Sequence, residues 1–339
     1  MIRIGVIGCG YWGPNLIRNF VSCPETQLVW ACDLDNNRMM KALRSFPNVK
    51  KTTNFMDILA DSNVDAIAIA TPVHTHFPIA EKCLHEGKHV LVEKPLAVSV
   101  EQGEKLVQLA AKQNLRLMCD HIFCYTGAVR KIKDMIKNGE LGELYYFDSV
   151  RINLGLFQQD VNVIWDLAPH DLSILSYLIG SEPVSVSAHG LSHAGNSLEN
   201  IAYLVLKYDH NFIAHLHLNW LSPVKIRRII IGGSEKMLVW NDLDPDEKIK
   251  IYNKGIMVKK LKQEERSRLL VSYRYGDMYA PQIDNTEALL LMVSEFASCI
   301  EENRPALTDD KSALRVLRVL EAAEISVKSH GANIPLKYT

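Results

Sequence analysis

Three polar residues in separate parts of the chain are the first candidates for chemistry. Lys94 stands between an acid and a proline at the end of an apolar run, and Asp166 and His170 lie four residues apart in the segment WDLAPHD. That spacing places both side chains on one face of a helix. An ammonium group can stabilise a developing alkoxide, and a carboxylate beside an imidazole can orient a general base. These three residues are therefore the candidate catalytic residues, with either His170 or Lys94 as the base.

Each of them also has a structural interpretation. Lys94 can pair with Glu93 at the surface. Pro169 is expected in the first turn of a helix, which makes Asp166 a candidate helix cap and His170 a half-buried histidine without a catalytic role. These alternatives stay open at the level of sequence.

A glycine-rich run near the N-terminus predicts a phosphate-binding turn. Residues 8–13 read GCGYWG, a G-x-G-x-x-G pattern that follows the apolar run 2–7 and opens a predicted helix. Gly8 permits the tight turn, Gly10 lets the backbone approach a pyrophosphate, and Gly13 lets helix and strand pack closely. The positive end of the helix then favours an anion.

An acidic residue at the end of the second predicted strand indicates which dinucleotide binds. Asp33 follows Gly13 by 20 residues. A carboxylate at this position accepts hydrogen bonds from the ribose hydroxyls and repels a 2′-phosphate, which favours NAD over NADP. Arg38 lies close by in sequence and can cover the adenine or admit the extra phosphate. The alternative is an ordinary strand–helix turn in which Asp33 caps a helix.

Other strand ends carry further candidates. Thr71 and Pro72 follow the apolar run DAIAIA, where a doubly wound sheet places its ligand loops, and His76 stands in the first turn of the next predicted helix. His76 can equally be a locally packed histidine.

Two clusters in the second half of the chain have weaker signals. His215 and His217 alternate on one predicted strand, and we interpret them as lining a polar or interface face of a sheet in preference to a metal site. Lys225, Arg227 and Arg228 form a basic cluster that can meet phosphates, although basic strand starts are usually solvated.

The composition is that of a globular protein with two domains. The chain has 339 residues, of which 47% are hydrophobic and 23% charged, and its formal net charge is −1. This balance argues against nucleic-acid binding, and no apolar run is long enough to span a membrane. Seven cysteines without CxxC spacing favour free thiols in a reducing cytosol. We therefore expect a cytoplasmic protein without a metal site.

Residues 1–123 alternate between predicted strands and helices, which is typical of a doubly wound parallel α/β sheet. The predicted strands are Ile2–Ile7, Leu28–Cys32, Val49–Lys51, Asp65–Ala70, His89–Val92 and Leu115–Cys119. The predicted helices are Gly13–Cys23, Asn36–Ser45, Phe55–Ala60, His76–Glu86 and Val100–Gln113.

After residue 124 strands dominate, and short turns between them predict an antiparallel or mixed sheet. The predicted strands are Glu143–Asn153, Val184–His189, Ile201–Lys207, Phe212–Trp220, Lys225–Ile231 and Lys236–Trp240. The predicted helices are Val129–Asn138, Pro169–Ile179, Asn285–Glu301 and Asp309–Ser329.

The motifs GCGYWG, ATPVHTH, GKHVLVEKP and WDLAPHD together resemble the glucose–fructose oxidoreductase, inositol dehydrogenase and rhizopine-catabolism family (Gfo/Idh/MocA). The resemblance spans the whole chain, and the EKP tripeptide is its most specific element. It implies an NAD-binding Rossmann domain over residues 1–123 and a substrate-binding α/β domain over residues 124–339 with a large open, mostly antiparallel sheet. The exposed face of that sheet commonly builds dimers or tetramers, so the resemblance implies a homodimer or homotetramer.

The resemblance also assigns roles to residues. Lys94 matches the lysine at nicotinamide and substrate, and Asp166 and His170 match the D-x-x-x-H pair. The predicted cofactor-binding residues are Gly8, Gly10, Tyr11, Trp12, Gly13, Asp33, Arg38, Thr71, Pro72, His76, Glu93 and Lys94. The predicted substrate-binding residues are Lys94, Arg151, Asn153, Asp166, His170, Lys225 and Arg227. Val163, Ile164 and Trp165, which precede Asp166, depart from the commonest family pattern, which has glycines there, and we expect this departure to change the size of the pocket.

The expected activity is NAD-dependent oxidation of a sugar ring hydroxyl to a ketone. Overall similarity favours the nucleotide-sugar branch, with C3 of UDP-N-acetylglucosamine or its uronate as the predicted position. A free sugar, inositol or a ketosugar reduced in the reverse direction are the alternatives within the enzymes. A non-catalytic NAD(H) sensor or scaffold is the alternative from another class, and it has no need for Lys94, Asp166 and His170.

Overall fold

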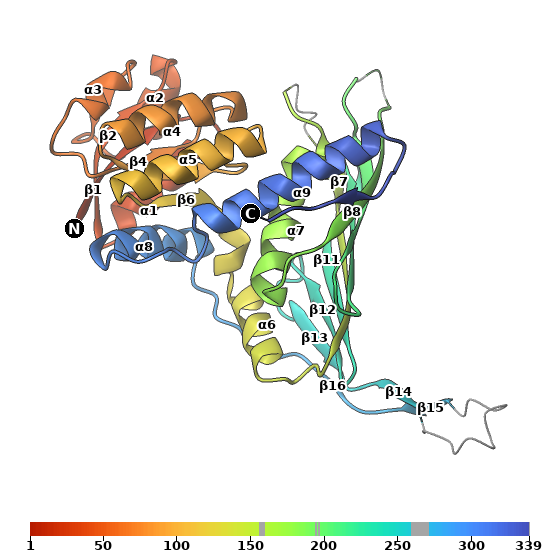
Figure 1. Cartoon of the computed structure of the whole chain (residues 1–339). Coiled ribbons are helices and arrows are strands. Elements are labelled where there is room, and N and C mark those ends of the chain that lie inside the picture. Colours follow the sequence, from red (N-terminus) through yellow and green to blue (C-terminus); the bar gives the residue numbers. More distant parts are fainter. Residues whose placement is uncertain (156–159, 194, 196, 259–270, 339) are drawn as a thin grey trace.

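The computed structural model describes residues 1–155, 160–193, 195, 197–258 and 271–338. Figure 1 shows two parts that lie side by side. In the N-terminal part helices surround a short sheet, and in the C-terminal part helices lie against a long sheet.

Within the described residues the N-terminal sheet has six strands in the order β3-β2-β1-β4-β5-β6, with all neighbours parallel. The strands are β1 (Ile2–Ile7), β2 (Thr26–Cys32), β3 (Lys50–Thr52), β4 (Ala66–Ile69), β5 (His89–Glu93) and β6 (Leu117–Asp120). The strand order reverses between β1 and β4, and in such sheets ligands bind at the carboxyl ends of the strands beside that point.

Helices alternate with these strands along the chain. They are α1 (Gly13–Ser22), α2 (Asn36–Ala42), α3 (Met56–Leu59), α4 (His76–His85) and α5 (Val100–Gln113), with the short 3₁₀ helices η1 (Val73–Thr75) and η2 (Ile122–Tyr125). All four residues of β4 are buried, which explains the continuous apolar runs in the sequence, because a sheet covered on both faces needs apolar side chains on both.

The C-terminal sheet has nine strands among the described residues, in the order β16-β13-β12-β11-β7-β10-β9-β8-β17. The pair β7–β10 is parallel and the other neighbours are antiparallel. The strands are β7 (Leu144–Leu154), β8 (Ser185–Leu191), β9 (Ile201–Lys207), β10 (Ile213–Asn219), β11 (Leu221–Gly233), β12 (Met237–Asn241), β13 (Ile249–Tyr252), β16 (Met278–Tyr279) and β17 (Ile334–Pro335). A separate hairpin pairs β14 (Gly255–Val258) with β15 (Val271–Arg274).

Helices α6 (Gly127–Lys137), α7 (Val163–Ile179) and α9 (Asp310–Lys328) lie on one face of the long sheet (Figure 1). Helix α8 (Ala288–Glu301) instead packs against α1 of the N-terminal part (Figure 1). Met292 and Phe296 of α8 join the same hydrophobic cluster as Ile4 and Phe20. The chain therefore returns to its N-terminal part after it has built the long sheet.

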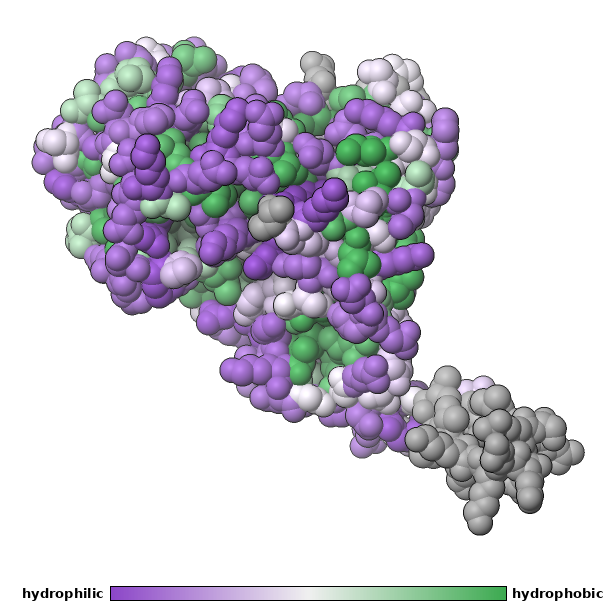
Figure 2. Space-filling model, in the orientation of Figure 1, coloured by the Kyte–Doolittle hydropathy of each residue, from purple (hydrophilic) through white to green (hydrophobic). Residues whose placement is uncertain are grey.

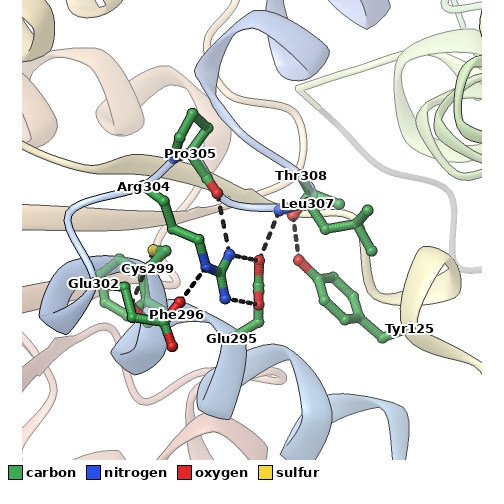
Figure 3. A network of polar contacts seen from close by, with 9 residues as sticks. All are labelled: Tyr125, Glu295, Phe296, Cys299, Glu302, Arg304, Pro305, Leu307 and Thr308. Carbon is green, nitrogen blue, oxygen red and sulfur yellow. Dashed lines mark hydrogen bonds and ion pairs between the residues drawn. The ribbon is translucent and has the colours of Figure 1, made fainter.

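Polar contacts hold the connection from α8 to α9 in place, and Figure 3 shows several of them. Arg304 donates two hydrogen bonds to the Glu295 carboxylate, at 2.7 and 2.9 Å. Further along, the amide of Cys119 in β6 donates to the Thr308 carbonyl at 3.1 Å, and the Thr308 hydroxyl donates to the Cys119 carbonyl at 2.9 Å. Tyr125 in turn hydrogen-bonds the Thr308 hydroxyl (Figure 3). These bonds fix η2 and α9 relative to the N-terminal sheet.

The predicted fold class is confirmed: a parallel α/β sheet is followed by a large, mostly antiparallel sheet with helices. The predicted start of the helix at Pro169 is wrong, because the helix begins at Val163. The strands β13 to β17 were not predicted. The domain boundary after residue 123 stays a prediction.

Hydrophilic residues predominate on the face shown in Figure 2, with smaller hydrophobic patches between them. Among the described residues, every helix is too short or too polar to cross a bilayer.

Candidate active site

A hydrogen-bonded ion pair joins the end of β5 to helix α7 at the centre of the candidate site. Lys94 follows β5, and its Nζ donates to the Asp166 carbonyl at 2.8 Å and to the Asp166 carboxylate at 3.0 Å. Both side chains are largely buried, with 13% and 20% exposed. The second carboxylate oxygen of Asp166 accepts from the Trp220 indole at 3.2 Å. The carboxylate therefore orients Lys94, whereas the sequence predicted that it would orient His170 or the substrate.

Helix α7 positions Asp166 and His170. The side chain of Asn162 accepts hydrogen bonds from the amides of Ile164 and Trp165, so Asn162 is the helix cap and Asp166 is not. Pro169 consequently lies inside the helix, where it removes one backbone hydrogen bond. Asp166 and His170 are one helical turn apart, and both side chains lie on the face that meets Lys94.

His170 is held as a neutral imidazole. Burial lowers its pKa well below the ordinary value, and the positive charges of Lys94, Arg151 and Arg227 lower the pKa further. Its ring lies edge-on to Phe123, with centroids 5.1 Å apart. Nδ1 is buried without a hydrogen-bond partner among the described residues. A neutral imidazole beside an ammonium can accept a proton from a substrate hydroxyl.

A buried ion pair braces the helix from the sheet side. Arg151 in β7 donates to both carboxylate oxygens of Asp171 at 2.9 and 2.8 Å, and the two side chains are 5% and 1% exposed. Arg151 also lies over the Phe123 ring, at 4.6 Å. Arg227 is the cross-strand partner of Arg151, and its guanidinium lies 6.0 Å from the same ring. The two arginines thus place positive charge beside His170.

Two carboxyl groups lie behind Lys94. Glu93 and Asp120 are paired across β5 and β6. Burial, together with the neighbouring Asp120, raises the pKa of Glu93 well above its ordinary value. Burial also raises the pKa of Asp120 to about 6. These shifts favour a protonated carboxyl in the pair, which avoids two adjacent buried charges.

The glycine-rich turn has the shape that a dinucleotide requires. Gly8 has φ +99°, and a Cβ there would meet the Ala70 carbonyl oxygen at 2.4 Å. A Cβ on Gly13 would meet the Gly8 oxygen at 2.1 Å. No atom of the described residues lies within 4 Å of a Cβ built on Gly10. The packing thus requires Gly8 and Gly13, whereas the space at Gly10 fits the close approach of a pyrophosphate.

Asp33 is tied to that turn. Its carboxylate accepts from the Cys9 amide at 2.6 Å and from the Asp35 amide at 2.8 Å. Arg38 is exposed and pairs with Asp35 at 3.3 Å. The adjoining Leu34 is 90% exposed. The fit to an adenosine ribose at the end of β2 therefore rests on Asp33, and Arg38 lies in the first turn of α2.

The remaining cofactor candidates lie on the loops after β4 and β5 and in the glycine-rich turn after β1. His76 is 1% exposed, and its ring nitrogens each lie 2.8 Å from a backbone carbonyl oxygen, Nδ1 from that of Pro95 and Nε2 from that of Thr71. The imidazole therefore ties the two loops together. Tyr11 is 84% exposed, and its ring meets Trp12 edge-on. Pro72 is also exposed.

The weaker candidates lie at the margin of the site or outside it. Asn153 is half-buried two residues after Arg151, and Lys225 is exposed in β11. His215 and His217 both stack with Tyr203 on a partly exposed face of the long sheet. Within the described part of the chain, no three histidine, cysteine or acidic side chains are grouped so as to hold a metal ion.

Several site residues were missed by the sequence analysis: Asp120, His121, Phe123, Asp171 and Trp220. Asp120 and His121 directly follow a predicted strand, as Lys94 does, so that signal was available. Asp171 adjoins His170 in the motif. Nothing in the sequence pointed to Phe123 or Trp220, whose roles depend on how the two sheets meet.

Comparisons with known proteins identify the family to which both parts of the chain belong. Residues 2–121 match the NAD-binding Rossmann-fold domain of the GFO/IDH/MocA oxidoreductase family, and residues 129–239 match its C-terminal domain. The chain is 26% identical to the UDP-N-acetylglucosamine 3-dehydrogenase of Acidithiobacillus ferrooxidans, over 97% of this chain and 98% of that one. It is 28% identical to the scyllo-inositol 2-dehydrogenase (NAD(+)) of Bacillus subtilis, over 70% and 73%.

The fold also resembles solved structures. The WlbA dehydrogenase from Bordetella pertussis, in complex with NADH and UDP-GlcNAcA, superposes with a TM-score of 0.82 at 20% identity, covering 100% of this chain and 98% of that one. This likeness is one of fold, whereas the family matches over both parts of the chain place the protein in the GFO/IDH/MocA family of NAD-binding oxidoreductases, as a dehydrogenase.

Proposed function

We propose that the protein oxidises a ring hydroxyl of a nucleotide-linked sugar, at C3 of UDP-N-acetylglucosamine or its uronate, to a ketone. The observation that carries the proposal is the contact between Lys94 and Asp166, one helical turn from His170. It brings three reactive groups from two separate parts of the chain to one place. The relative from A. ferrooxidans, similar over nearly the whole chain, supports the substrate class.

Each residue has a separate role in the proposed reaction. His170, kept neutral by burial, accepts the hydroxyl proton. Lys94 stabilises the negative charge that develops on the oxygen, and Asp166 holds the ammonium in place. Bound NAD supplies the hydride acceptor. Arg227 and Lys225 provide positive charge for a diphosphate at the margin of the site.

The location and the assembly that we propose are those expected from the sequence. All seven cysteines are free and buried, which supports a reducing, cytoplasmic compartment. Helices α6, α7 and α9 lie on one face of the long sheet (Figure 1), and we propose that the other face joins copies of the chain into a homodimer or homotetramer. Light scattering after size exclusion measures the mass, and a monomer at micromolar concentration would contradict this assembly.

A substrate panel tests the function. NADH absorbance is followed with UDP-N-acetylglucosamine, its uronate, free N-acetylglucosamine and inositol, each with NAD or NADP. The expected result is a kcat/KM for a UDP-sugar at least about tenfold above those of the free compounds, which corresponds to one or two extra charge-assisted contacts. Preference for inositol or a free sugar would refute the substrate class. NADH binding without turnover of any sugar would favour a sensor.

A further inference from the structure

His121 is a buried imidazole to which the reaction proposed above assigns no role. It follows β6 directly and is 1% exposed. Neither ring nitrogen has a hydrogen-bond partner among the described residues. Its backbone is well held, since its amide donates to Cys119 and its carbonyl accepts from Cys124. A buried polar group without a partner is costly, so water or another small molecule is expected at the ring.

His121 lies close to the candidate catalytic groups. Burial and the charge of Lys94 together lower the pKa of His121 to about 4. His121 is in turn among the groups that lower the pKa of His170. Phe123, two residues after His121, is the ring that meets His170 edge-on. Both imidazoles therefore lie near the Lys94 ammonium, His121 directly after β6 and His170 on α7.

On its other side His121 lines a polar cavity of about 230 Å³. The cavity is also lined by Ser173, Tyr177, Thr308, Ser312 and Arg315. Ser173 is one helical turn after His170, and its hydroxyl donates to the His170 carbonyl at 2.8 Å. Arg315 is 44% exposed. The cavity therefore runs from a fully buried imidazole to a side chain in contact with solvent.

The hydroxyl groups of this wall differ in their partners. The Thr308 hydroxyl donates to the Cys119 carbonyl and also hydrogen-bonds Tyr125. The Ser312 hydroxyl donates to the Asp309 carbonyl, so its oxygen can accept a hydrogen bond from water. With hydroxyls, a guanidinium and an imidazole on its surface, the cavity has the polar partners that ordered water needs.

We propose that His121 takes up the proton released at His170 and passes it through water in this cavity to solvent. The proposal rests on the proposed role of His170. Oxidation of the alcohol breaks a C–H and an O–H bond, and the C=O bond forms. The C–H electron pair leaves as hydride to the bound NAD, and the O–H proton goes to His170. An imidazole can take a proton at one nitrogen and release one from the other, so His170 returns to its neutral form when His121 accepts that proton.

Kinetics of His121→Phe and His121→Gln test the relay, with the exposed His85→Phe as matched control. Both His121 variants are expected to keep the NAD affinity and KM of the wild type while kcat falls about tenfold or more. Exogenous imidazole is expected to restore part of that loss, and the solvent deuterium isotope effect on kcat is expected to rise. A kcat and isotope effect equal to those of the wild type, in a folded variant, would overturn the relay. Loss of NAD binding or a lowered melting temperature in both variants would show that His121 has a structural role, and this result would also overturn the relay.

A second measurement does not depend on turnover. A crystal structure of the NAD complex is expected to show ordered water hydrogen-bonded to a ring nitrogen of His121 and continuing toward Arg315. A dry cavity, or ring nitrogens paired with protein groups, would refute the proposal. If the wild type oxidises inositol but no UDP-sugar, the proposed substrate fails, and the same relay tests are then run with inositol.

Discussion

Replacing Arg151 with methionine is expected to destabilise the protein strongly. Arg151 makes two hydrogen bonds to Asp171, and both side chains are at least 95% buried, with 5% and 1% exposed. The variant leaves the Asp171 carboxylate buried without its counter-charge. Breaking such a pair typically costs about 3–5 kcal/mol. The free energy of unfolding of Arg151→Met is therefore expected to fall by about that amount.

Removing both charges is expected to cost much less. In Arg151→Met/Asp171→Leu no charge is stranded, and apolar replacement of a buried pair is often close to neutral. Urea unfolding followed by tryptophan fluorescence, in the absence of NAD, measures both variants. Lys105→Met, which breaks an ion pair with 57% and 77% exposed side chains, serves as a control that changes little. Equal stability of the wild type and Arg151→Met, accompanied by a raised KM, would refute the bracing role and place Arg151 at the substrate.

Three further predictions concern the reaction, the cofactor and the dependence of stability on pH. Lys94→Met is expected to lower kcat about 10²–10³-fold, because the charge that stabilises the alkoxide is lost; the exposed control Lys112→Met should retain the wild-type rate in the NADH absorbance assay. Asp33→Asn is expected to raise the Kd for NAD about tenfold or more, since the carboxylate that fixes the Cys9 amide and faces the ribose loses its charge; an unchanged Kd in a fluorescence titration would contradict this. The lowered pKa of His121, about 4 against an ordinary 6.5, means that below about pH 6.5 the unfolded chain takes up a proton that the folded chain excludes. The wild type should therefore lose about 2 kcal/mol of stability relative to His121→Phe between pH 8 and pH 5, and a pH-independent difference in unfolding free energy would refute the shift.

Much of the N-terminal part could be predicted because its signals are local. The strand Ile2–Ile7 was predicted with its observed bounds, since a run of apolar residues is enough to mark a strand buried on both faces. The glycine pattern is similarly local, because Gly8 has a φ of +99° and a Cβ on Gly13 would meet the Gly8 carbonyl oxygen.

The start of α7 shows where local signals mislead. Pro169 is typical of a first helical turn, yet the Asn162 side chain caps the helix seven residues earlier. Tertiary packing offsets the lost hydrogen bond inside the helix. Trp165 illustrates this, because its indole donates to Glu324 of α9.

The contacts of the site itself could not be predicted, since they join distant segments. Asp166 contacts Lys94, 72 residues away, and Trp220, 54 residues away. Arg151 was predicted to contact substrate because of its charge, whereas its guanidinium binds Asp171. Such partners follow from strand register and helix docking, and residue spacing alone does not encode them.

The most direct test of the account is a crystal structure with NAD and a UDP-sugar bound together. The account predicts that the oxygen of the reacting carbon lies within hydrogen-bond distance of Lys94 Nζ and a ring nitrogen of His170, with the nicotinamide against the same carbon. A sugar bound elsewhere, or a nicotinamide separated from Lys94 and His170 by other side chains, would contradict it.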